Sequence, residues 1–396
     1  KFTTGSKSMK LLIVPSWYPT NIHPESGTFF RDRAIILQRY GFSITIAAHV
    51  LHSTRDILRF KQNVSNIETI NDGGVLVYKT EAINTFPKMP RKAFNSYKNS
   101  ILSLVKNVIN KSKPEFVFIN SSLYGGAALA RYLYDEMIPF MVSEHLKEFL
   151  GNDEFSLFQK ECINECYNYS SKIIATSEVL KNNITDKFNV DNKKVVLIPN
   201  PADTDCFLPK RRKLDGPFTF ISVALLRPEK RLDLLIKAFS MLSKKIPNIV
   251  LTIIGDGPEK DKLKLLSHKL EVNNRINFIG YQKKIVVADI IRDHDALVLS
   301  SQVETFGVVL IEAMSAGLPV IATKCGGPES IVLPETGMLV ESNDKNKLFN
   351  AMRIMVENYD NYDSKIIRQI AINTYGDKAY GKNIKNAIAS VLSAKY

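Results

Sequence analysis

Short apolar runs alternate with longer amphipathic segments along the first half of the chain. The apolar runs have the length of buried strands, which we expect at residues 11–14, 43–48, 75–79, 116–120, 140–143, 172–176 and 195–199. Apolar positions recur at helical spacing in residues 31–40, 94–110 and 126–135. Such alternation predicts a parallel sheet with helices on both faces.

The pattern breaks near residues 199–213, where prolines and basic residues replace the apolar runs. A second alternation follows, with strands expected at 218–223, 249–254, 276–279, 296–300 and 320–322 and helices at 231–242, 260–270 and 307–316. We therefore predict two Rossmann-like domains, residues 9–205 and 206–375, with a ligand at the carboxyl ends of the strands. Residues 376–396 are expected to form a helix that packs back on the first domain. Residues 1–8 precede Met9 and are interpreted as an addition from cloning.

Composition places the chain among globular proteins. Of its 396 residues, 45% are apolar and 23% charged, and no apolar run approaches the length of a membrane-spanning helix. Residues 11–14 are too few for a secretory signal, and Pro15 follows them at once. The four cysteines (Cys162, Cys166, Cys206, Cys325) show no metal-ligand spacing, which is typical of a reducing compartment. We expect a cytoplasmic protein, with peripheral attachment to the inner face of the membrane as a further expectation.

The formal charge of +13 calls for an anionic partner. Much of the excess is local, because no acidic residue lies between Glu81 and Glu115 while residues 88–113 are rich in lysine and arginine. Apolar positions recur there at helical spacing, so this segment is expected to form a basic amphipathic helix that contacts an anionic membrane surface. A helix that docks on its own domain and leaves a solvated basic face fits the same pattern, and both interpretations stay open. No nucleic acid is expected, because no nucleic-acid-binding motif accompanies the charge.

Residues 297–330 carry the strongest candidate chemistry. A strand is expected to end near residue 300, a short loop holds Glu304, and Gly307 opens an apolar helix that contains Glu312. The N-terminus of that helix offers N–H groups and a positive dipole end to a pyrophosphate. Gly307 lets a ligand approach the backbone closely.

Glu304 and Glu312 flank this helix start. Glu312 lies about 7.5 Å along the helix axis at 1.5 Å per residue, so the two acids are too far apart for a retaining glycosidase pair, which stands roughly 5–5.5 Å apart. They suit the hydroxyls at the two ends of a sugar–diphosphate–nucleoside. We therefore expect Glu304 to bind the sugar and Glu312 the ribose.

The chain resembles the retaining GT-B glycosyltransferases of family 4. The E-x7-E arrangement begins within S-x-x-E-T-F-G and is followed by A-M-S-A-G-L-P-V-I-A-T and G-G-P-E, and VVLIPNPADTDCFLP resembles the family's linker. SVALLRPEKRLDLLIKAF and IIGDGPE resemble its donor-domain blocks. The resemblance covers most of the chain and implies a GT-B α/β fold, with two domains facing a central cleft.

The resemblance also implies roles for residues of the second domain. Lys230 would neutralise the donor diphosphate and act as a catalytic group together with Glu304. Arg227 is a substitute candidate for the arginine that the family often places where this chain has Ala224-Leu225, and Arg231 stands where glycine is usual. The remaining donor-binding candidates are Tyr281 at the base, Glu312 at the ribose, and the backbones of Phe306, Gly307, Val308 and Val309.

Two candidates come from the first domain. Gly27, in Pro24-Glu25-Ser26-Gly27, matches a donor-binding glycine, although Ser26 replaces the family's first glycine. His145, which follows an expected strand, matches a catalytic histidine that faces the donor sugar. Glu144 and Glu148 also lie near this strand end.

The implied activity is transfer of a hexose-type sugar from a UDP- or GDP-linked donor to a glycan or lipid-linked acceptor, with retained stereochemistry. Surface glycan or glycolipid synthesis is the expected process. No metal or other cofactor is expected: Asp203-Thr204-Asp205 spells the D-x-D of metal-dependent transferases, but it lies in the predicted linker. Lys230, Arg227 and the helix dipole would neutralise the leaving group instead.

Other functions are open at this stage. A sugar-nucleotide epimerase of the same fold would release a free altered sugar, and a phosphorylase or sucrose-type synthase would use a soluble acceptor. A non-enzymatic protein that binds membranes or nucleic acid would explain the charge but not the Glu304 and Glu312 arrangement.

Overall fold

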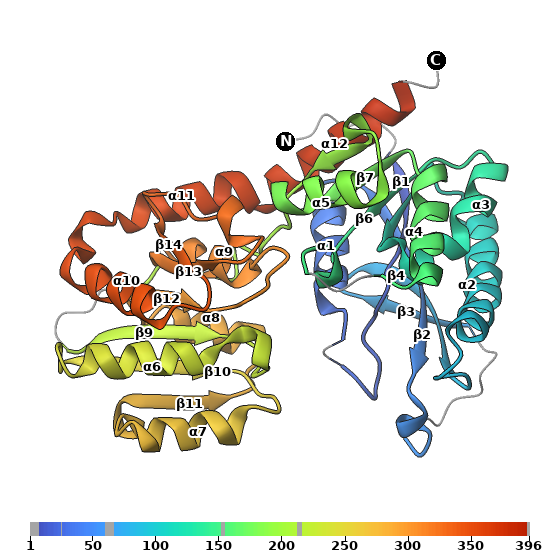
Figure 1. Cartoon of the computed structure of the whole chain (residues 1–396). Coiled ribbons are helices and arrows are strands. Elements are labelled where there is room, and N and C mark those ends of the chain that lie inside the picture. The colour runs from blue at the N-terminus through green and yellow to red at the C-terminus, as the bar shows by residue number, and fades with distance from the viewer. Residues whose placement is uncertain (1–7, 25, 60–66, 152–154, 212–215, 394–396) are drawn as a thin grey trace. The chain divides into compact units, whose positions relative to one another are not determined.

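The computed structural model describes the chain except residues 1–7, 25, 60–66, 152–154, 212–215 and 394–396 (Figure 1). The interpretation of residues 1–8 as an addition therefore falls almost wholly outside the described residues. The chain folds into two compact units, residues 1–198 with 380–396 and residues 199–379. The boundary expected at 205/206 thus lies between Ile198 and Pro199, and the last helix belongs to the first unit only from Tyr380 onward.

The first unit holds an eight-stranded sheet of order β3-β4-β2-β1-β5-β6-β7-β8. Its strands are β1 (Lys10–Val14), β2 (Ser43–His52), β3 (Glu68–Asp72), β4 (Val75–Ile83), β5 (Phe116–Asn120), β6 (Phe140–Ser143), β7 (Lys172–Ala175) and β8 (Val195–Leu197). All neighbours are parallel except β3 and β4. That hairpin departs from the predicted parallel sheet, because Gly73 and Gly74 adopt positive φ angles and close a two-residue turn.

Helices cover both faces of this sheet. They are α1 (Thr28–Arg39), α2 (Pro90–Ser112), α3 (Ala127–Asp135), α4 (Leu157–Tyr169), α5 (Glu178–Phe188) and α12 (Asp377–Ser393). Leu12 and Val14 of β1 join a core cluster with α2, α3 and α4, whereas Leu11 and Ile13 join another with α1 and α12. The alternation of side chains along a strand thus divides the core into two layers.

The second unit holds a parallel six-stranded sheet of order β11-β10-β9-β12-β13-β14. Its strands are β9 (Phe218–Val223), β10 (Ile249–Ile254), β11 (Ile276–Gly280), β12 (Ala296–Leu299), β13 (Val320–Lys324) and β14 (Gly337–Glu341). Its helices are α6 (Leu232–Ser243), α7 (Lys260–Lys269), α8 (Lys284–Ile291), α9 (Val308–Ser315), α10 (Lys345–Glu357) and α11 (Ser364–Tyr375). One core layer contains α8, α9 and α11, and the other contains α6 and α10.

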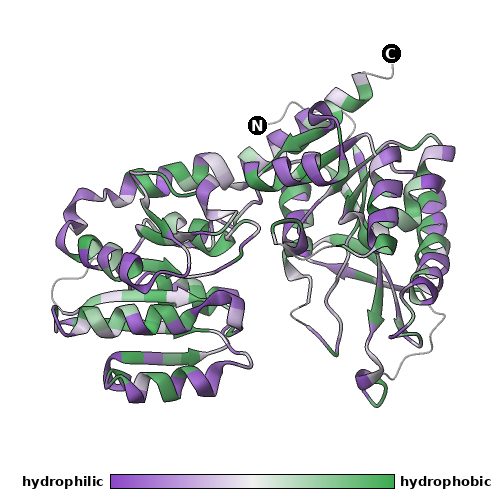
Figure 2. Ribbon diagram, in the orientation of Figure 1, coloured by the Kyte–Doolittle hydropathy of each residue, from purple (hydrophilic) through white to green (hydrophobic). Residues whose placement is uncertain are grey.

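Hydropathy follows this layered arrangement. Helices such as α2 and α6 carry mixed green and purple residues in Figure 2, as amphipathic helices against a sheet should. Among the described residues, no helix combines the length and apolar character needed to cross a membrane.

Candidate functional site

The loop between β12 and α9 is tied to the loop that follows β13. Glu304 forms an isolated parallel bridge with Gly326. The Glu304 N–H donates to the Cys325 carbonyl at 3.0 Å, and the Gly327 N–H donates to the Glu304 carbonyl at 2.7 Å. Main-chain bonds therefore fix the position of Glu304 without help from its side chain.

Two glycines shape the start of α9. Gly307 is the N-cap with φ 100°, a left-handed conformation that glycine adopts without strain. A Cβ on Gly327 would lie 2.2 Å from the Cα of Phe306, so only glycine lets the two loops come this close. The Phe306 ring is buried (2% exposed) and meets the ring of Tyr375. With its ring in the core, Phe306 can offer a ligand only its backbone, and Val308 and Val309, the first residues of α9, are partly buried.

A lysine and a glutamate form an ion pair beside this helix start. Lys230 Nζ lies 2.5 Å from Glu304 Oε2, and their side chains are 22% and 17% exposed. The Ser301 hydroxyl donates to the same oxygen at 3.2 Å. The two groups assigned to the diphosphate and the sugar hydroxyl thus lie side by side, and both side chains are partly exposed to solvent.

The segment that carries Lys230 is held against the same loop. The Ser300 hydroxyl donates to the Lys230 carbonyl at 2.9 Å, and the Gln302 N–H donates to the Glu229 carbonyl at 2.8 Å. The next residue, Arg231, has φ 47°, the left-handed region that favours glycine. Arg231 pairs with Asp233 at 3.0 Å, which helps to hold a non-glycine residue there.

The Gly-Asp-Gly-Pro turn, residues 255–258, packs against the chain that leads from β9 to Lys230. A Cβ on Gly255 would lie 1.8 Å from the Ala224 carbonyl oxygen, and one on Gly257 would lie 2.6 Å from that of Leu226. The glycines are therefore needed because the chain leading to Lys230 passes directly over the turn.

The other donor-binding candidates occupy less constrained positions. Arg227 is exposed and precedes the short helix Pro228–Lys230, where its carbonyl accepts from the Lys230 N–H at 3.0 Å. Tyr281 follows β11 and is 48% exposed. Glu312 is partly buried on α9. Their placement neither adds to nor opposes the roles that the family resemblance implies.

Gly27 begins α1 in the first unit. Its φ is 74°, and a Cβ there would lie 2.3 Å from the Trp17 carbonyl oxygen. Gly27 thus has a steric reason to be glycine, because it lets the start of α1 lie against the loop after β1.

His145, just after β6, has its ring held by two polar neighbours. Arg33 Nη1 lies 2.9 Å from His145 Nε2, and Ser143 Oγ lies 3.0 Å from the same nitrogen. Burial, and then the Arg33 charge, hold the pKa of His145 well below its ordinary value. Arg33 can only donate, so Nε2 accepts and the ring is neutral. His145 is therefore suited to hydrogen bonding rather than to supplying positive charge.

Glu144 lies beneath this histidine and is fully buried. Its Oε1 accepts from the Ser122 N–H and from the Tyr167 hydroxyl, both at 3.0 Å. Burial raises the pKa of Glu144 to about 7 despite these bonds. Among the described residues, the other carboxyl oxygen, Oε2, has no hydrogen-bond partner. The two bonds to Oε1 give Glu144 a structural role.

We expect Glu144 to make the protein less stable as the pH rises. Its proton is retained in the folded state between about pH 4.5 and 7 and lost in the unfolded state, so folding stability should fall across this window by about 3 kcal/mol. Urea unfolding of the wild type and Glu144→Gln at pH 5 and pH 8 checks this. The loss between the two pH values should be smaller in Glu144→Gln by about that amount, and equal losses would contradict it.

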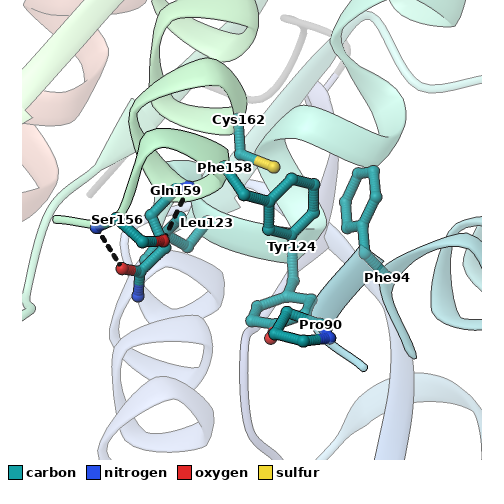
Figure 3. A pocket seen from close by; sticks show the side chains of 8 residues that line it. All are labelled: Pro90, Phe94, Leu123, Tyr124, Ser156, Phe158, Gln159 and Cys162. Atoms are coloured by element: carbon teal, nitrogen blue, oxygen red, sulfur yellow. Dashed lines mark hydrogen bonds between the residues drawn. The ribbon is translucent and has the colours of Figure 1, made fainter. Parts of the chain in front are cut away.

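The described residues of the first unit form hollows, among them the following two. One, of about 280 Å³, opens where β1, β2 and β5 end and is lined by Ser16, Trp17, His49, Val50, Leu51, Asn84, Ala93, Tyr97, Ser121, Leu123, Tyr124 and Leu146. The other, of about 210 Å³, lies between α2 and α4 (Figure 3) and is lined by Pro90, Phe94, Leu123, Tyr124, Ser156, Phe158, Gln159 and Cys162. The first has the more suitable position for a substrate, because ligands of parallel sheets bind at the carboxyl ends of strands.

Two family models match adjoining parts of the chain. The one described as "Glycosyl transferases group 1" matches residues 205–371, and the one described as "Glycosyltransferase Family 4" matches residues 49–206. The chain belongs to the group 1, family 4 glycosyltransferases.

Relatives of this glycosyltransferase support the assignment along most of its length. An uncharacterized glycosyltransferase of Haemophilus influenzae is 29% identical over 287 residues, 71% of this chain and 76% of that protein. The lipopolysaccharide 1,6-galactosyltransferase of Salmonella typhimurium is 28% identical over 316 residues, 76% of this chain and 83% of that protein. The structure of Anabaena HepE in complex with UDP matches with a TM-score of 0.73 at 18% identity, covering 96% of this chain and 100% of that one. The predicted α/β fold with two Rossmann-like units of GT-B type is confirmed.

The glycosyltransferase has supporting residues that sequence reasoning missed. Ser301 stands three residues before Glu304 in the S-x-x-E motif, a spacing that offered a signal. Arg33 gave no signal, because 112 residues separate it from His145. Gly327 belongs to the G-G-P-E motif, but its steric role depends on Phe306 and is visible only in the folded chain.

The D-x-D sequence, expected in a linker, lies near the start of the second unit. Asp203 lies 3.5 Å from Lys284 and accepts from the Cys206 N–H at 3.3 Å. These contacts give Asp203 a structural role in the second unit of the glycosyltransferase.

The basic helix predicted near residues 88–113 is α2, and its apolar face packs on its own unit. Tyr97, Ile101, Leu104, Val105 and Val108 are buried in the core. The core therefore occupies the apolar face of α2, as in the interpretation of a helix that docks on its own domain. The exposed lysines of α2 remain able to meet an anionic surface through charge alone.

Proposed function

We propose that this glycosyltransferase moves a hexose from a UDP- or GDP-linked donor to an acceptor hydroxyl with retained stereochemistry, in surface glycan or glycolipid synthesis. The Lys230–Glu304 pair at the start of α9 carries the proposal. It offers a cation for a diphosphate and a carboxylate for sugar hydroxyls beside the N-terminus of a helix.

In the proposed reaction the bond between the anomeric carbon and the diphosphate oxygen breaks, and a bond to the acceptor oxygen forms on the same face. The acceptor proton passes to the departing phosphate. Lys230, the start of α9 and Arg227 stabilise the negative charge that develops on the leaving group, so no metal takes part. Tyr281, Glu312 and Gly27 bind the donor, and neutral His145 hydrogen-bonds the sugar.

We place the acceptor in the hollow beside Trp17. His49 lines this hollow, and burial lowers its pKa to about 4, so its ring is neutral at physiological pH. The described residues that line it bring aromatic rings, hydroxyls and an amide but no charged side chain. Trp17 is 42% exposed and offers a flat apolar face. These properties favour a neutral sugar ring of a glycan or glycolipid over a charged acceptor.

A donor screen tests the function. Binding of the correct sugar nucleotide raises apparent stability, by about 2.7 kcal/mol at a concentration one hundred times its Kd. UDP-glucose, UDP-galactose, GDP-mannose and ADP-glucose should be compared by thermal denaturation, and the product's anomeric configuration read by NMR. Release of a free altered sugar would favour an epimerase, and an inverted product would contradict retention.

We further propose that the lysines of α2 bring the enzyme to anionic membranes. Replacing Lys98, Lys106 and Lys111 with glutamine should lower the binding constant for phosphatidylglycerol vesicles by about a hundredfold, since each charge contributes about 1 kcal/mol. Co-sedimentation with the vesicles measures this constant. The matched control replaces three exposed lysines of α7 (Lys262, Lys264 and Lys269). Equal loss in both variants would assign binding to net charge, and no loss would exclude α2.

A further inference from the structure

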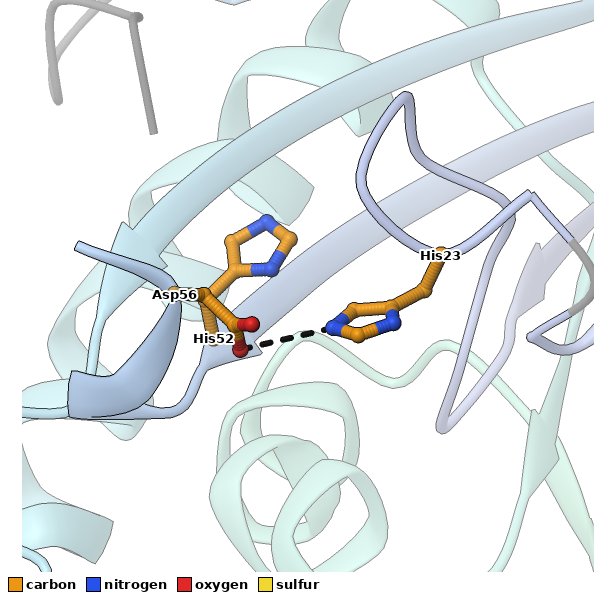
Figure 4. A group of neighbouring side chains, drawn as sticks. All are labelled: His23, His52 and Asp56. Atoms are coloured by element: carbon orange, nitrogen blue, oxygen red, sulfur yellow. Dashed lines mark ion pairs between the residues drawn. The ribbon is translucent and has the colours of Figure 1, made fainter. Parts of the chain in front are cut away.

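Three potential metal ligands meet in the first unit, outside the residues assigned to either substrate. They are His23, from the loop between β1 and α1, His52, the last residue of β2, and Asp56, from the turn Thr54–Asp56. One ligand atom from each lies within 4.8 Å of the others. Figure 4 shows the three side chains converging, with His23 Nε2 3.3 Å from Asp56 Oδ2.

Buried charged residues hold the ring of His52 in place. Its Nε2 lies 2.6 Å from Glu81 Oε2, and Glu81 Oε1 lies 2.9 Å from Lys79 Nζ. The side chains of His52, Glu81 and Lys79 are 0%, 7% and 6% exposed. When Nε2–H donates to the carboxylate, the lone pair of the neutral ring lies on Nδ1. Metal-binding histidines are commonly oriented by a carboxylate in this way.

Asp56 is oriented as well. Its Oδ2 accepts from the Ser53 N–H at 3.2 Å, within a capping box that starts the turn. The Asp56 side chain is 13% exposed, whereas that of His23 is 51% exposed. Two ligands are therefore fixed on the sheet side, and the exposed third leaves an entry path for an ion.

We propose that His23, His52 and Asp56 bind a zinc ion. Two imidazole nitrogens and one carboxylate oxygen are a donor set that Zn²⁺ accepts, and water would complete its tetrahedral coordination. Softer sites that prefer copper(I) contain thiolates or thioethers, and calcium and magnesium sites consist of oxygen donors. The proposal is independent of the sugar-transfer reaction.

An ion pair between His23 and Asp56 is the simpler explanation of their contact. It does not account for the buried carboxylate of Glu81 beside His52, whose removal from water costs free energy that an uncharged residue would avoid. Lys79 offsets part of that cost and also pairs with Glu68 at 3.1 Å. In a metal site, the Glu81 carboxylate would orient the His52 ring, and an outer carboxylate of this kind strengthens metal binding by roughly 10–100-fold.

Zinc at this site would fasten the loop after β1 to the end of β2. That loop carries His23 and leads to Gly27, the N-cap of α1. The ion would therefore order a segment assigned to the donor without taking part in the chemistry.

The test uses the full chain without an affinity tag, stripped with a chelator and then dialysed. Isothermal titration with ZnCl₂ should show one ion per chain, and metal analysis after gel filtration should recover it. His23→Ala and Asp56→Asn should each weaken zinc binding at least tenfold, and Glu81→Gln should weaken it by about 10–100-fold. His268→Ala, which removes an exposed histidine of α7, is the matched control and should bind as the wild type does.

His23 is exposed on a loop, so His23→Ala should stay folded, which circular dichroism checks. Asp56→Asn gives a second variant if it does not. Failure of the wild type to bind zinc stoichiometrically would overturn the proposal. Binding that survives both ligand substitutions would also overturn it, because the ion would then lie elsewhere. Neither result bears on sugar transfer, which is measured separately.

Discussion

Lys230→Ala should lower kcat/KM for sugar transfer by about a hundredfold to a thousandfold while the protein stays folded. Lys230 would supply a positive charge to the departing diphosphate, and loss of one preorganised stabilising group typically costs that much. The Lys230 side chain is 22% exposed, so its charge is only partly screened by water. Initial rates with the donor identified by the screen give the measurement.

Glu304→Gln should have a comparable effect for a different reason. The amide keeps the shape of the side chain but loses the charge that pairs with Lys230 at 2.5 Å and that would accept sugar hydroxyls. Main-chain bonds from Glu304 to Cys325 and Gly327 do not involve the side chain, so the loop should keep its path. Lys237→Ala removes a lysine of α6 that pairs with Asp233, and it controls for loss of charge in the same unit. Near-wild-type turnover in Lys230→Ala would contradict the role of Lys230 at the diphosphate, and in Glu304→Gln it would contradict the role of Glu304 at the sugar hydroxyls.

Gly327→Ala should destabilise the second unit and weaken donor binding together. The added Cβ would lie 2.2 Å from the Cα and 2.4 Å from the N and O of Phe306, and backbone atoms cannot give way as a flexible side chain can. Overpacking typically costs 1–3 kcal/mol, and we expect a loss of about 3 kcal/mol here. Relief requires the loop from Glu304 to Gly307 to move, which would misplace the start of α9. Thermal denaturation with and without the sugar nucleotide measures both effects.

Gly125→Ala provides the comparison for Gly327→Ala. A Cβ on Gly125 would meet its nearest neighbour, the Tyr97 hydroxyl, at 3.5 Å, an ordinary contact. The two variants add the same methyl group, so a difference between them reports the steric clash. If Gly327→Ala proves as stable as Gly125→Ala and binds donor normally, the close approach of the two loops is unimportant.

The sequence indicated most of the fold because its core strands are apolar and uninterrupted. β5, β6 and β10 are recognisable in this way, and the helices between them show one apolar face. β3 was missed because its five residues, Glu-Thr-Ile-Asn-Asp, pair at the sheet edge and only alternate residues are partly buried. An edge strand needs little apolar surface, so periodicity cannot reveal it.

Sequence patterns could not decide what the apolar face of α2 contacts. A bilayer and a protein core select the same residues at the same spacing. The candidate site shows a similar limit. Lys230 and Glu304 were each assigned a ligand, yet their pairing across 74 residues depends on how two strand-end loops fold against each other. Arg33 and His145 are likewise joined only by the tertiary structure.

The first unit is interrupted along the chain, since its polypeptide leaves after Ile198 and returns at Tyr380. Tyr380, Ile384 and Ile388 of α12 then fill part of its core. A ribosome therefore releases every residue of the second unit before it supplies the last piece of the first. Until then the nascent first unit keeps an apolar surface uncovered, so the part synthesised earliest is completed last.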